Sequence, residues 1–215
     1  NYRIKPLHRL IMLSDAYQRS SHASKTAHQQ DPNNQWLSHF SPRRLTAEEI
    51  RDSLLAVSKE LDSLPGEAHP FPPESTWNFS QHAPFHAVYQ TNKRSVYMMV
   101  QRQRRHPFLS LFDGPDPNTS SPVRQQTTVP TQALYFLNDE LFHSYANLTA
   151  SRILASYPAN PMIDELYQLL FQRLPTEAET DITLQFINTY DGTDEQKWQA
   201  LSRILLSSNE FLYVD

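Results

Sequence analysis

The chain has 215 residues, of which 39% are hydrophobic and 20% charged, and a formal net charge of −4. This composition excludes wholesale disorder, and no apolar run reaches the roughly 18 residues needed to span a membrane. The negative charge argues against nucleic acid as a partner. The absence of cysteine excludes disulfides, thiolate metal ligands, a cysteine nucleophile and covalently attached haem c within the chain.

Glycine occurs only 3 times and proline 16 times. Scarce glycine disfavours a turn-rich β fold, and proline breaks helix interiors, so helices are expected in the long proline-free runs. The chain is therefore predicted to be mainly α, an irregular helical domain with a long loop-rich middle, at most a short strand pair and a small C-terminal helical bundle. We predict one domain over 1–215, with a helical part at 1–64, a loop-rich core motif region at 65–130 and the bundle at 131–215.

In the first half of the chain, a helix is predicted over 5–19, with Pro6 in its first turn. A second helix begins at the capping box formed by Thr46 and Glu49 and ends at Pro65-Gly66. Residues 65–84 contain five prolines and are predicted to form a loop. Residues 95–100 (SVYMMV) favour a short strand or a buried extended segment, and a partner strand would have to come from 76–90.

In the second half, a helix is predicted to begin near Pro130, with Thr128 as its N-cap, and another covers 139–156. Further helices begin at Pro161 and at a second capping box, Thr176 with Glu179, which opens a helix that ends at Asp191-Gly192. A last helix is predicted with Asp194 as its cap. Short connections between the last three helices indicate a small bundle.

The densest polar region lies between residues 93 and 132. Its candidate binding or structural residues are Arg94, Arg105, Asp113, Asp116, Asn118, Arg124, Thr128 and Gln132. One interpretation is an internal network in which arginines hold the acidic loop and its carbonyl groups. The other is a site where arginines bind an anionic ligand or a sugar.

No catalytic residue and no metal ligand is assigned from the sequence. Asp113, Asp116 and Asn118 resemble a set of ligands for a hard cation, but the order of an EF-hand loop is absent and Asp-Pro and Pro-Asn pairs are ordinary turn formers. The sequence also lacks a nucleophile elbow, a phosphate-binding loop and a dinucleotide-binding glycine motif.

Several stretches, in order along nearly the whole chain, resemble the planctomycete-type domain of unknown function 1553. They are 5–12 (KPLHRLIM), 42–45 (PRRL), 47–56 (AEEIRDSLLA), 94–97 (RSVY), 112–118 (FDGPDPN), 127–134 (TTVPTQAL), 137–139 (LND) and 208–215 (SNEFLYVD). Two of these stretches coincide with the polar region described above.

The resemblance implies the C-terminal domain of a large exported bacterial protein, periplasmic or extracellular. In such proteins the upstream part usually carries a signal peptide and often a cytochrome c-like segment that would bind haem c. Because the chain opens at Asn1 without Met, it is interpreted as a fragment that contains neither the signal peptide nor a cofactor of its own.

Two functional hypotheses follow. The first is a non-catalytic interaction or structural module that packs on upstream domains of the same polypeptide, which the helical pattern and the lack of a catalytic motif favour. Such a module is expected to expose an apolar patch on its first helix. The alternative is part of a carbohydrate-active enzyme or binding site, with sulfated polysaccharide as a candidate ligand for the Arg/Asp loops.

Overall fold

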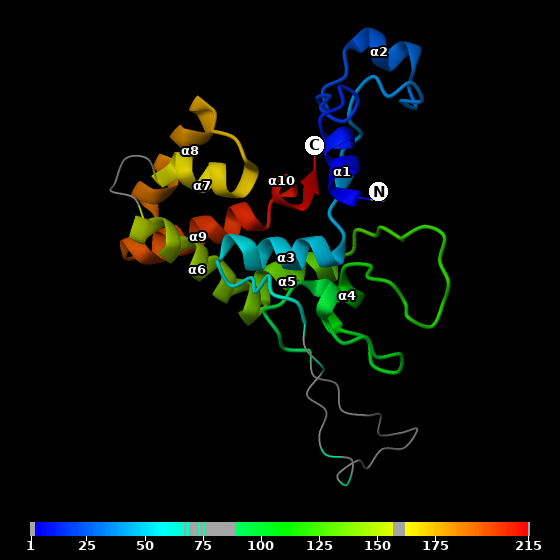
Figure 1. Cartoon of the computed structure of the whole chain (residues 1–215). Helices are drawn as coiled ribbons and strands as arrows, with labels where there is room; N and C mark the ends of the chain where they lie inside the picture. The colour runs from blue at the N-terminus through cyan, green and yellow to red at the C-terminus, as the bar shows by residue number, and fades with distance from the viewer. Residues whose placement is uncertain are drawn as a thin grey trace. The chain divides into compact units, whose positions relative to one another are not determined.

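A computed structural model describes residues 3–66, 68, 73, 75, 89–156 and 162–214 of the chain. The structure is mainly helical with one pair of very short strands, which confirms the predicted fold class (Figure 1). Its elements are α1 (Ile4–Met12), α2 (Lys25–Gln30), β1 (Arg43–Arg44), α3 (Ala47–Val57), the 3-10 helix η2 (Ser95–Tyr97), α4 (Pro107–Leu111), α5 (Pro130–Asn138), α6 (Glu140–Ser156), α7 (Met162–Phe171), α8 (Glu177–Thr189), α9 (Asp194–Leu206), α10 (Asn209–Leu212) and β2 (Tyr213–Val214).

The chain divides into two compact units. The first consists of residues 1–44 and 213–215 and contains α1, α2 and an antiparallel pairing of β1 with β2, in which Arg43 lies opposite Val214. The second, residues 45–212, contains all the remaining helices. The prediction of one domain over 1–215 stays a prediction.

The hydrophobic core of the second unit is centred on α6, which packs against α3, α5, α7 and α9. Its apolar side chains are removed from water, the main source of stability for such a unit. The side chains of Ile50, Leu54, Phe142, Leu166 and Leu206 are fully buried. An aromatic cluster extends this core toward α4 and α5 through the rings of Phe108, Phe112, Tyr135, Phe136 and Phe142.

The predicted helix starts depend on local capping chemistry. Both predicted capping boxes are present, since Thr46 accepts a hydrogen bond from the Glu49 main chain and Thr176 accepts one from the Glu179 main chain. The last helix is capped differently from the prediction. Its N-cap is Thr193, whose hydroxyl accepts a hydrogen bond from the main-chain N–H of Gln196, and Asp194 is the first helical residue.

Other differences concern element ends and short elements. The first helix stops at Met12 instead of continuing to residue 19, and α3 stops at Val57 because Lys59 adopts a left-handed conformation with φ 63°. The helices α2, α4 and α10 are too short to produce a detectable hydrophobic period. Most of the loop predicted at 65–84, most of the candidate partner segment at 76–90 and the helix start at Pro161 lie outside the described residues.

Of the two alternatives predicted for residues 95–100, a strand or a buried extended segment, the strand is wrong. Residues Ser95–Tyr97 form a 3-10 helix, and the chain becomes extended only at Met98, with φ −71° and ψ 147°. The physical reason is a side chain from another element. Asp52 of α3 accepts hydrogen bonds from the main-chain N–H of Ser95, at 2.8 Å, and from its hydroxyl, at 2.7 Å.

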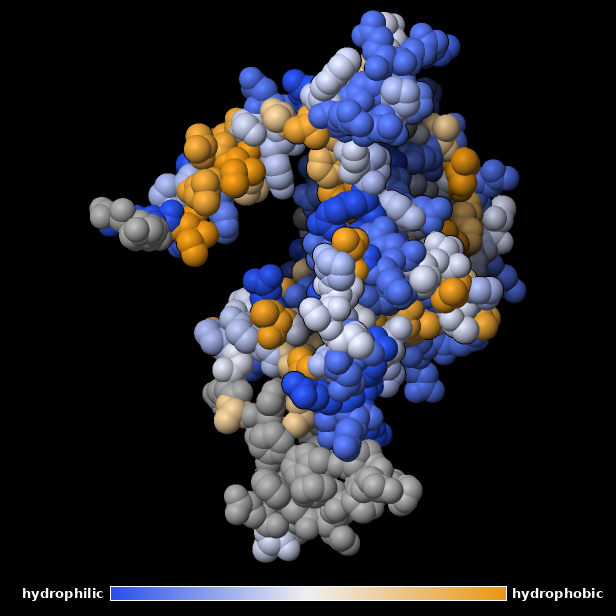
Figure 2. Space-filling view, turned by 90° about the vertical axis from the view of Figure 1, so that its right-hand side faces the viewer, coloured by the Kyte–Doolittle hydropathy of each residue, from blue (hydrophilic) through white to orange (hydrophobic). Residues whose placement is uncertain are grey.

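The helix α1 has an exposed apolar face, as the interaction hypothesis expects. Its residues Ile4, Leu7, Leu10 and Ile11 share one side of the helix and are between 47% and 71% exposed. Figure 2 shows apolar side chains gathered on this helix (orange, upper left). In the described part of the chain, no helix has the length and apolar character needed to cross a bilayer.

One buried polar atom in α9 generates a stability prediction. The hydroxyl of Ser202 is fully buried and has no hydrogen-bond partner among the described residues. Because an unsatisfied buried hydroxyl costs free energy, Ser202→Ala is expected to leave the free energy of unfolding unchanged or raise it by about 1 kcal/mol. Urea denaturation monitored by circular dichroism measures the change.

The matched control is Ser58→Ala. The hydroxyl of Ser58 is also buried but donates to the carbonyl of Leu54 at 2.8 Å. This variant is expected to lose about 1 kcal/mol. A loss of similar size in Ser202→Ala would show that its hydroxyl is hydrogen-bonded after all.

Candidate functional site

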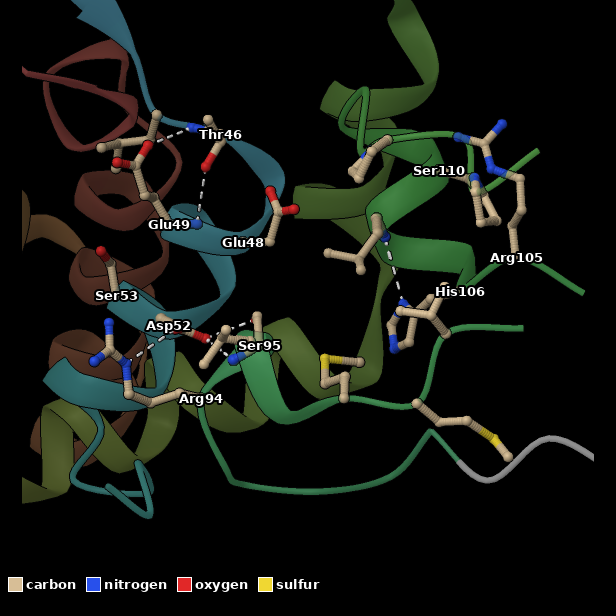
Figure 3. A pocket seen from close by; sticks show the side chains of 18 of the residues that line it. Thr46, Glu48, Glu49, Asp52, Ser53, Arg94, Ser95, Arg105, His106 and Ser110 are labelled. Atoms are coloured by element: carbon tan, nitrogen blue, oxygen red, sulfur yellow. Dashed lines mark hydrogen bonds and ion pairs between the residues drawn. The ribbon is translucent and has the colours of Figure 1, made fainter. Parts of the chain in front are cut away.

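A groove of about 920 Å³ lies in the second unit. It is lined by residues of 45–63 from α3 and the segments on either side of it, by residues of 94–101 other than Tyr97, by residues of 105–117 from α4 and its flanks, and by Arg124. Figure 3 shows the polar side chains of α3 on one side and those of residues 105–110 on the other. We call it the α3–α4 groove.

Two adjacent charged residues of α3 fix one wall of this groove. Asp52 binds Ser95 as described above, and its second carboxylate oxygen lies 3.8 Å from Nε of Arg94. Arg51 is buried and donates to the carbonyl of Lys93 at 2.9 Å, to the hydroxyl of Ser95 at 3.2 Å and to the carbonyl of Thr91. Residues 91–95 are thereby held on α3.

Glu48 and Arg124 form an ion pair at the groove. Nη1 of Arg124 donates to both carboxylate oxygens of Glu48, at 3.0 and 2.8 Å. Burial alone would raise the pKa of Glu48, but the hydrogen bond from Arg124 and its positive charge lower it overall. Glu48 is therefore ionised at neutral pH and unsuited to act as a general acid.

The predicted site residues of the acidic loop form hydrogen bonds that stabilise the loop. Asp113 has a left-handed backbone, with φ 62°, and its carboxylate accepts hydrogen bonds from the main chain and hydroxyl of Thr127, at 2.8 and 2.7 Å. Asp116 accepts a hydrogen bond from the main-chain N–H of Asn118 at 2.8 Å, as in an ordinary Asx turn. Asn118 in turn donates to the carbonyl of Arg102 at 3.0 Å.

The position of Gly114 in this loop requires a residue without a side chain. Arg105 donates to the carbonyl of Gly114 at 2.9 Å, which places the Gly114 backbone against the end of α4. A Cβ atom on Gly114 would lie 2.6 Å from the carbonyl oxygen of Leu109. Only glycine fits this position without movement of the backbone.

The two remaining predicted residues have different outcomes. Gln132 is buried, and its amide donates to the carbonyl of Leu111 at 2.9 Å, which joins α5 to the end of α4. Thr128 is not the N-cap of α5, because that position is occupied by Val129, directly before Pro130. The assignment of Thr128 was therefore displaced by one residue.

The structure divides the predicted set between two places. Arg94, Arg105 and Arg124 line the α3–α4 groove. The other members lie in the segment 112–132 and are not among the residues described as lining it; they are Asp113, Asp116, Asn118, Thr128 and Gln132. Among the described residues, no group of three or more His, Asp or Glu side chains is placed to hold a metal ion.

Sequence reasoning missed the acidic partners of the groove arginines. Glu48 and Asp52 are one helical turn apart, directly after the capping box, so their position on one face of α3 could have been inferred. It also missed His106, whose Nδ1 accepts a hydrogen bond from the main-chain N–H of Leu109 at 3.4 Å and so caps α4. Burial, with a smaller contribution from Arg51, lowers the pKa of His106 to about 4.

Asp113 provides the first prediction for this site. Asp113→Ala is expected to lower the free energy of unfolding by about 2 kcal/mol, because alanine disfavours the left-handed backbone and the bonds to Thr127 are lost. Asp113→Gly, which accepts this backbone, is expected to regain about 1 kcal/mol of the loss. Denaturant titration distinguishes the two variants. Equal losses would mean that the backbone conformation contributes nothing.

His106 provides a pH prediction. Its pKa of about 4 in the folded state lies below its ordinary value of 6.5, so the unfolded chain takes up the proton first. The stability contributed by the neutral ring is complete above about pH 6.5 and is lost as the pH falls toward 4. His106→Asn keeps an N-cap acceptor but does not titrate.

The measurement is the melting temperature of both proteins from pH 7.5 to 4. As the pH falls from 7.5 to 4, the melting temperature of the unmodified chain is expected to fall further than that of His106→Asn. Because all other titrating groups are common to both proteins, parallel curves would contradict the assignment.

The comparisons with known proteins agree with the resemblance noted in the sequence. A family model described as PSD1, a protein of unknown function (DUF1553), matches residues 1–187. Neither curated proteins nor solved structures match the chain. Since the matched region covers most of the chain, the chain belongs to the DUF1553 (PSD1) family.

Proposed function

We propose that the chain is a non-catalytic interaction module whose α3–α4 groove binds an extended polypeptide segment from an adjoining domain. By family resemblance, that domain is the upstream part of the same exported polypeptide. The proposal assigns no chemical step to the chain. In this proposal the charged residues of the central region stabilise the structure, and apolar side chains contact the bound segment.

The observation that carries the proposal is a contrast between the charged and apolar residues of the groove. The charged side chains of Glu48, Asp52, Arg105 and Arg124 have hydrogen-bond or ion-pair partners within the unit. The apolar ones include Val96 and Val100, which are 74% and 76% exposed. Satisfied charges around exposed apolar surface are typical of a docking site rather than of a catalytic centre.

The backbone at the groove favours a polypeptide as the occupant. Met98 is extended, and in the described structure the main-chain groups of Met99 and Val100 have no hydrogen-bond partner. A bound segment could pair with these groups as an added strand does at the edge of a sheet. Methionine side chains adapt to the shape of a partner, and Met98 and Met99 both line the groove.

The exposed face of α1 supports the same proposal from a different unit. A helix of nine residues with its apolar side chains in water gains little from its own hydrogen bonds and needs a packing partner to be stable. We infer that an adjoining domain also covers this face. The two surfaces together would give the module more contact area than the groove alone.

One residue favours the alternative of an anionic carbohydrate ligand. The side chain of Arg94 is 58% exposed, and its distance of 3.8 Å to Asp52 is the longest among the ion pairs at the groove. Arg94 could therefore turn to a sulfate group at little cost. A sulfated glycan that raises the melting temperature of the chain, but not that of Arg94→Gln, would favour this alternative.

The test uses photo-crosslinking in the full-length polypeptide. Benzoylphenylalanine at position 100, on the groove, is expected to crosslink to a segment outside residues 1–215, identified by mass spectrometry. The same group at Val123 is the control, because Val123 is 75% exposed but is not among the described lining residues. Equal crosslinking at both positions, or crosslinks from position 100 only to residues within 1–215, would overturn the proposal.

A further inference from the structure

A second cavity, of about 580 Å³, lies in the same unit and has different chemistry. It is lined by residues of α3, α4, α5 and α6 and by residues 89–92, and we call it the aromatic cavity. The rings of Phe108, Tyr135 and Tyr145 form much of its wall, together with Leu54 and Leu111. Small-molecule sites are typically of this size and combine apolar and aromatic walls with few polar groups.

Arg51 supplies the positive charge of this cavity. Its side chain is only 10% exposed, and it lines the cavity from α3. Three of its five N–H groups donate to Thr91, Lys93 and Ser95. The hydrogen on Nε and one on Nη2 have no hydrogen-bond partner among the described residues, which leaves donors available to a ligand.

Arg51 has one carboxylate in ion-pair distance among the described residues. Its Nη1 lies 3.5 Å from Oδ1 of Asp52, and that oxygen also accepts hydrogen bonds from Ser95. Burial lowers the pKa of Arg51, which means that the protein holds this cation at a cost in desolvation free energy. An anion that entered the cavity and accepted the free N–H groups would offset that cost.

The remaining polar groups are compatible with an anionic aromatic ligand. Burial raises the pKa values of Tyr135 and Tyr145, so both phenols are neutral. His106 is neutral above about pH 4 for the reason given above. Asp139 also adds a carboxylate to the lining. Its Oδ1 accepts a hydrogen bond from the main-chain N–H of Phe142 at 2.9 Å and so caps α6, and its side chain is hydrogen-bonded to Tyr135, so a bound carboxylate has to lie on the Arg51 side of the cavity.

We propose that the aromatic cavity binds a small aromatic carboxylate. The ring packs against Phe108, Tyr135 and Tyr145, and the carboxylate accepts hydrogen bonds from Arg51. Leu141, which is 56% exposed, together with the exposed residues Gln90 and Asn92, forms the opening to solvent. The inference does not rest on the proposed docking function, because His106 is the one residue described as lining both cavities.

The test compares three probes that share a ring and differ in charge. They are 2-naphthoate, 2-naphthamide and 2-naphthylmethylamine, titrated into the whole chain by calorimetry at pH 7. Because hydrogen bonds to a charged group contribute more than neutral ones, 2-naphthoate is expected to bind at least about tenfold more tightly than 2-naphthamide. The cationic amine is expected to bind most weakly, since it meets the charge of Arg51.

Two variants locate the site without altering Arg51. Leu141→Trp places a large ring at the opening and is expected to weaken binding of 2-naphthoate at least tenfold. Leu137→Trp is the matched control, because Leu137 is 67% exposed and is not among the described lining residues. Its binding is expected to stay within twofold of the unmodified chain, and circular dichroism checks that both variants fold.

A measurement on the unmodified chain keeps the test independent of variant folding. Nuclear Overhauser contacts between 2-naphthoate and the ring protons of Phe108 and Tyr135 are expected. The proposal is overturned if no probe binds, if the three probes bind equally, or if the contacts fall on residues outside the cavity. Equal weakening by both tryptophan variants also overturns it.

Discussion

The arrangement of the second unit depends on one neighbouring pair of charges, Arg51 and Asp52 of α3. Both hold Ser95, although the two residues line different cavities. Residues 91–94, before η2, form one isolated β-bridge, between Lys93 and Asp62, and Arg51 binds the carbonyl groups of Thr91 and Lys93 beside it. Removing either side chain would leave the other incompletely compensated within the unit. The walls of the groove and of the aromatic cavity therefore share the attachment of residues 91–95 to α3.

The two proposed sites differ in how their charged groups are paired. In the groove, carboxylates and guanidinium groups pair with each other, so recognition there falls to the exposed side chains of Val96 and Val100. Docking by such surfaces is dominated by a few apolar anchors surrounded by a polar rim. The aromatic cavity differs from the groove. There the buried guanidinium of Arg51 has N–H groups without a hydrogen-bond partner among the described residues, and the surrounding wall is largely apolar. One helix thus contributes to a surface suited to a polypeptide and to a cavity suited to a small anion.

The helices could be predicted because their starts depend on neighbouring residues. Contacts between residues far apart in the sequence could not be predicted. The capping boxes at Thr46 and Thr176 and the proline at position 130 act within one turn of the chain, so the sequence pattern locates them correctly. The pairs Glu48–Arg124 and Asp52–Ser95 join residues 76 and 43 positions apart, and nothing local in the sequence specifies them. The strand expected at 95–100 failed for this reason, since the composition of that segment favours a strand but a side chain of α3 holds its first residue. The same limit explains why the arginines of the groove were predicted and their acidic partners were missed.

The connection between the two ends of the second unit has a consequence for how the chain folds. The main-chain N–H of Leu45 donates to the carbonyl of Leu212 at 2.8 Å, so the first and last residues of the unit meet. The strands β1 and β2 follow directly outside this bond, yet the whole unit separates them in sequence. Closing so long a loop costs entropy that two short strands cannot recover by themselves. Once residues 45–212 have folded, that entropy has already been lost and the strand pair can form at little further cost. We therefore expect the two-stranded pairing to form after the second unit, which has the connectivity of an inserted domain.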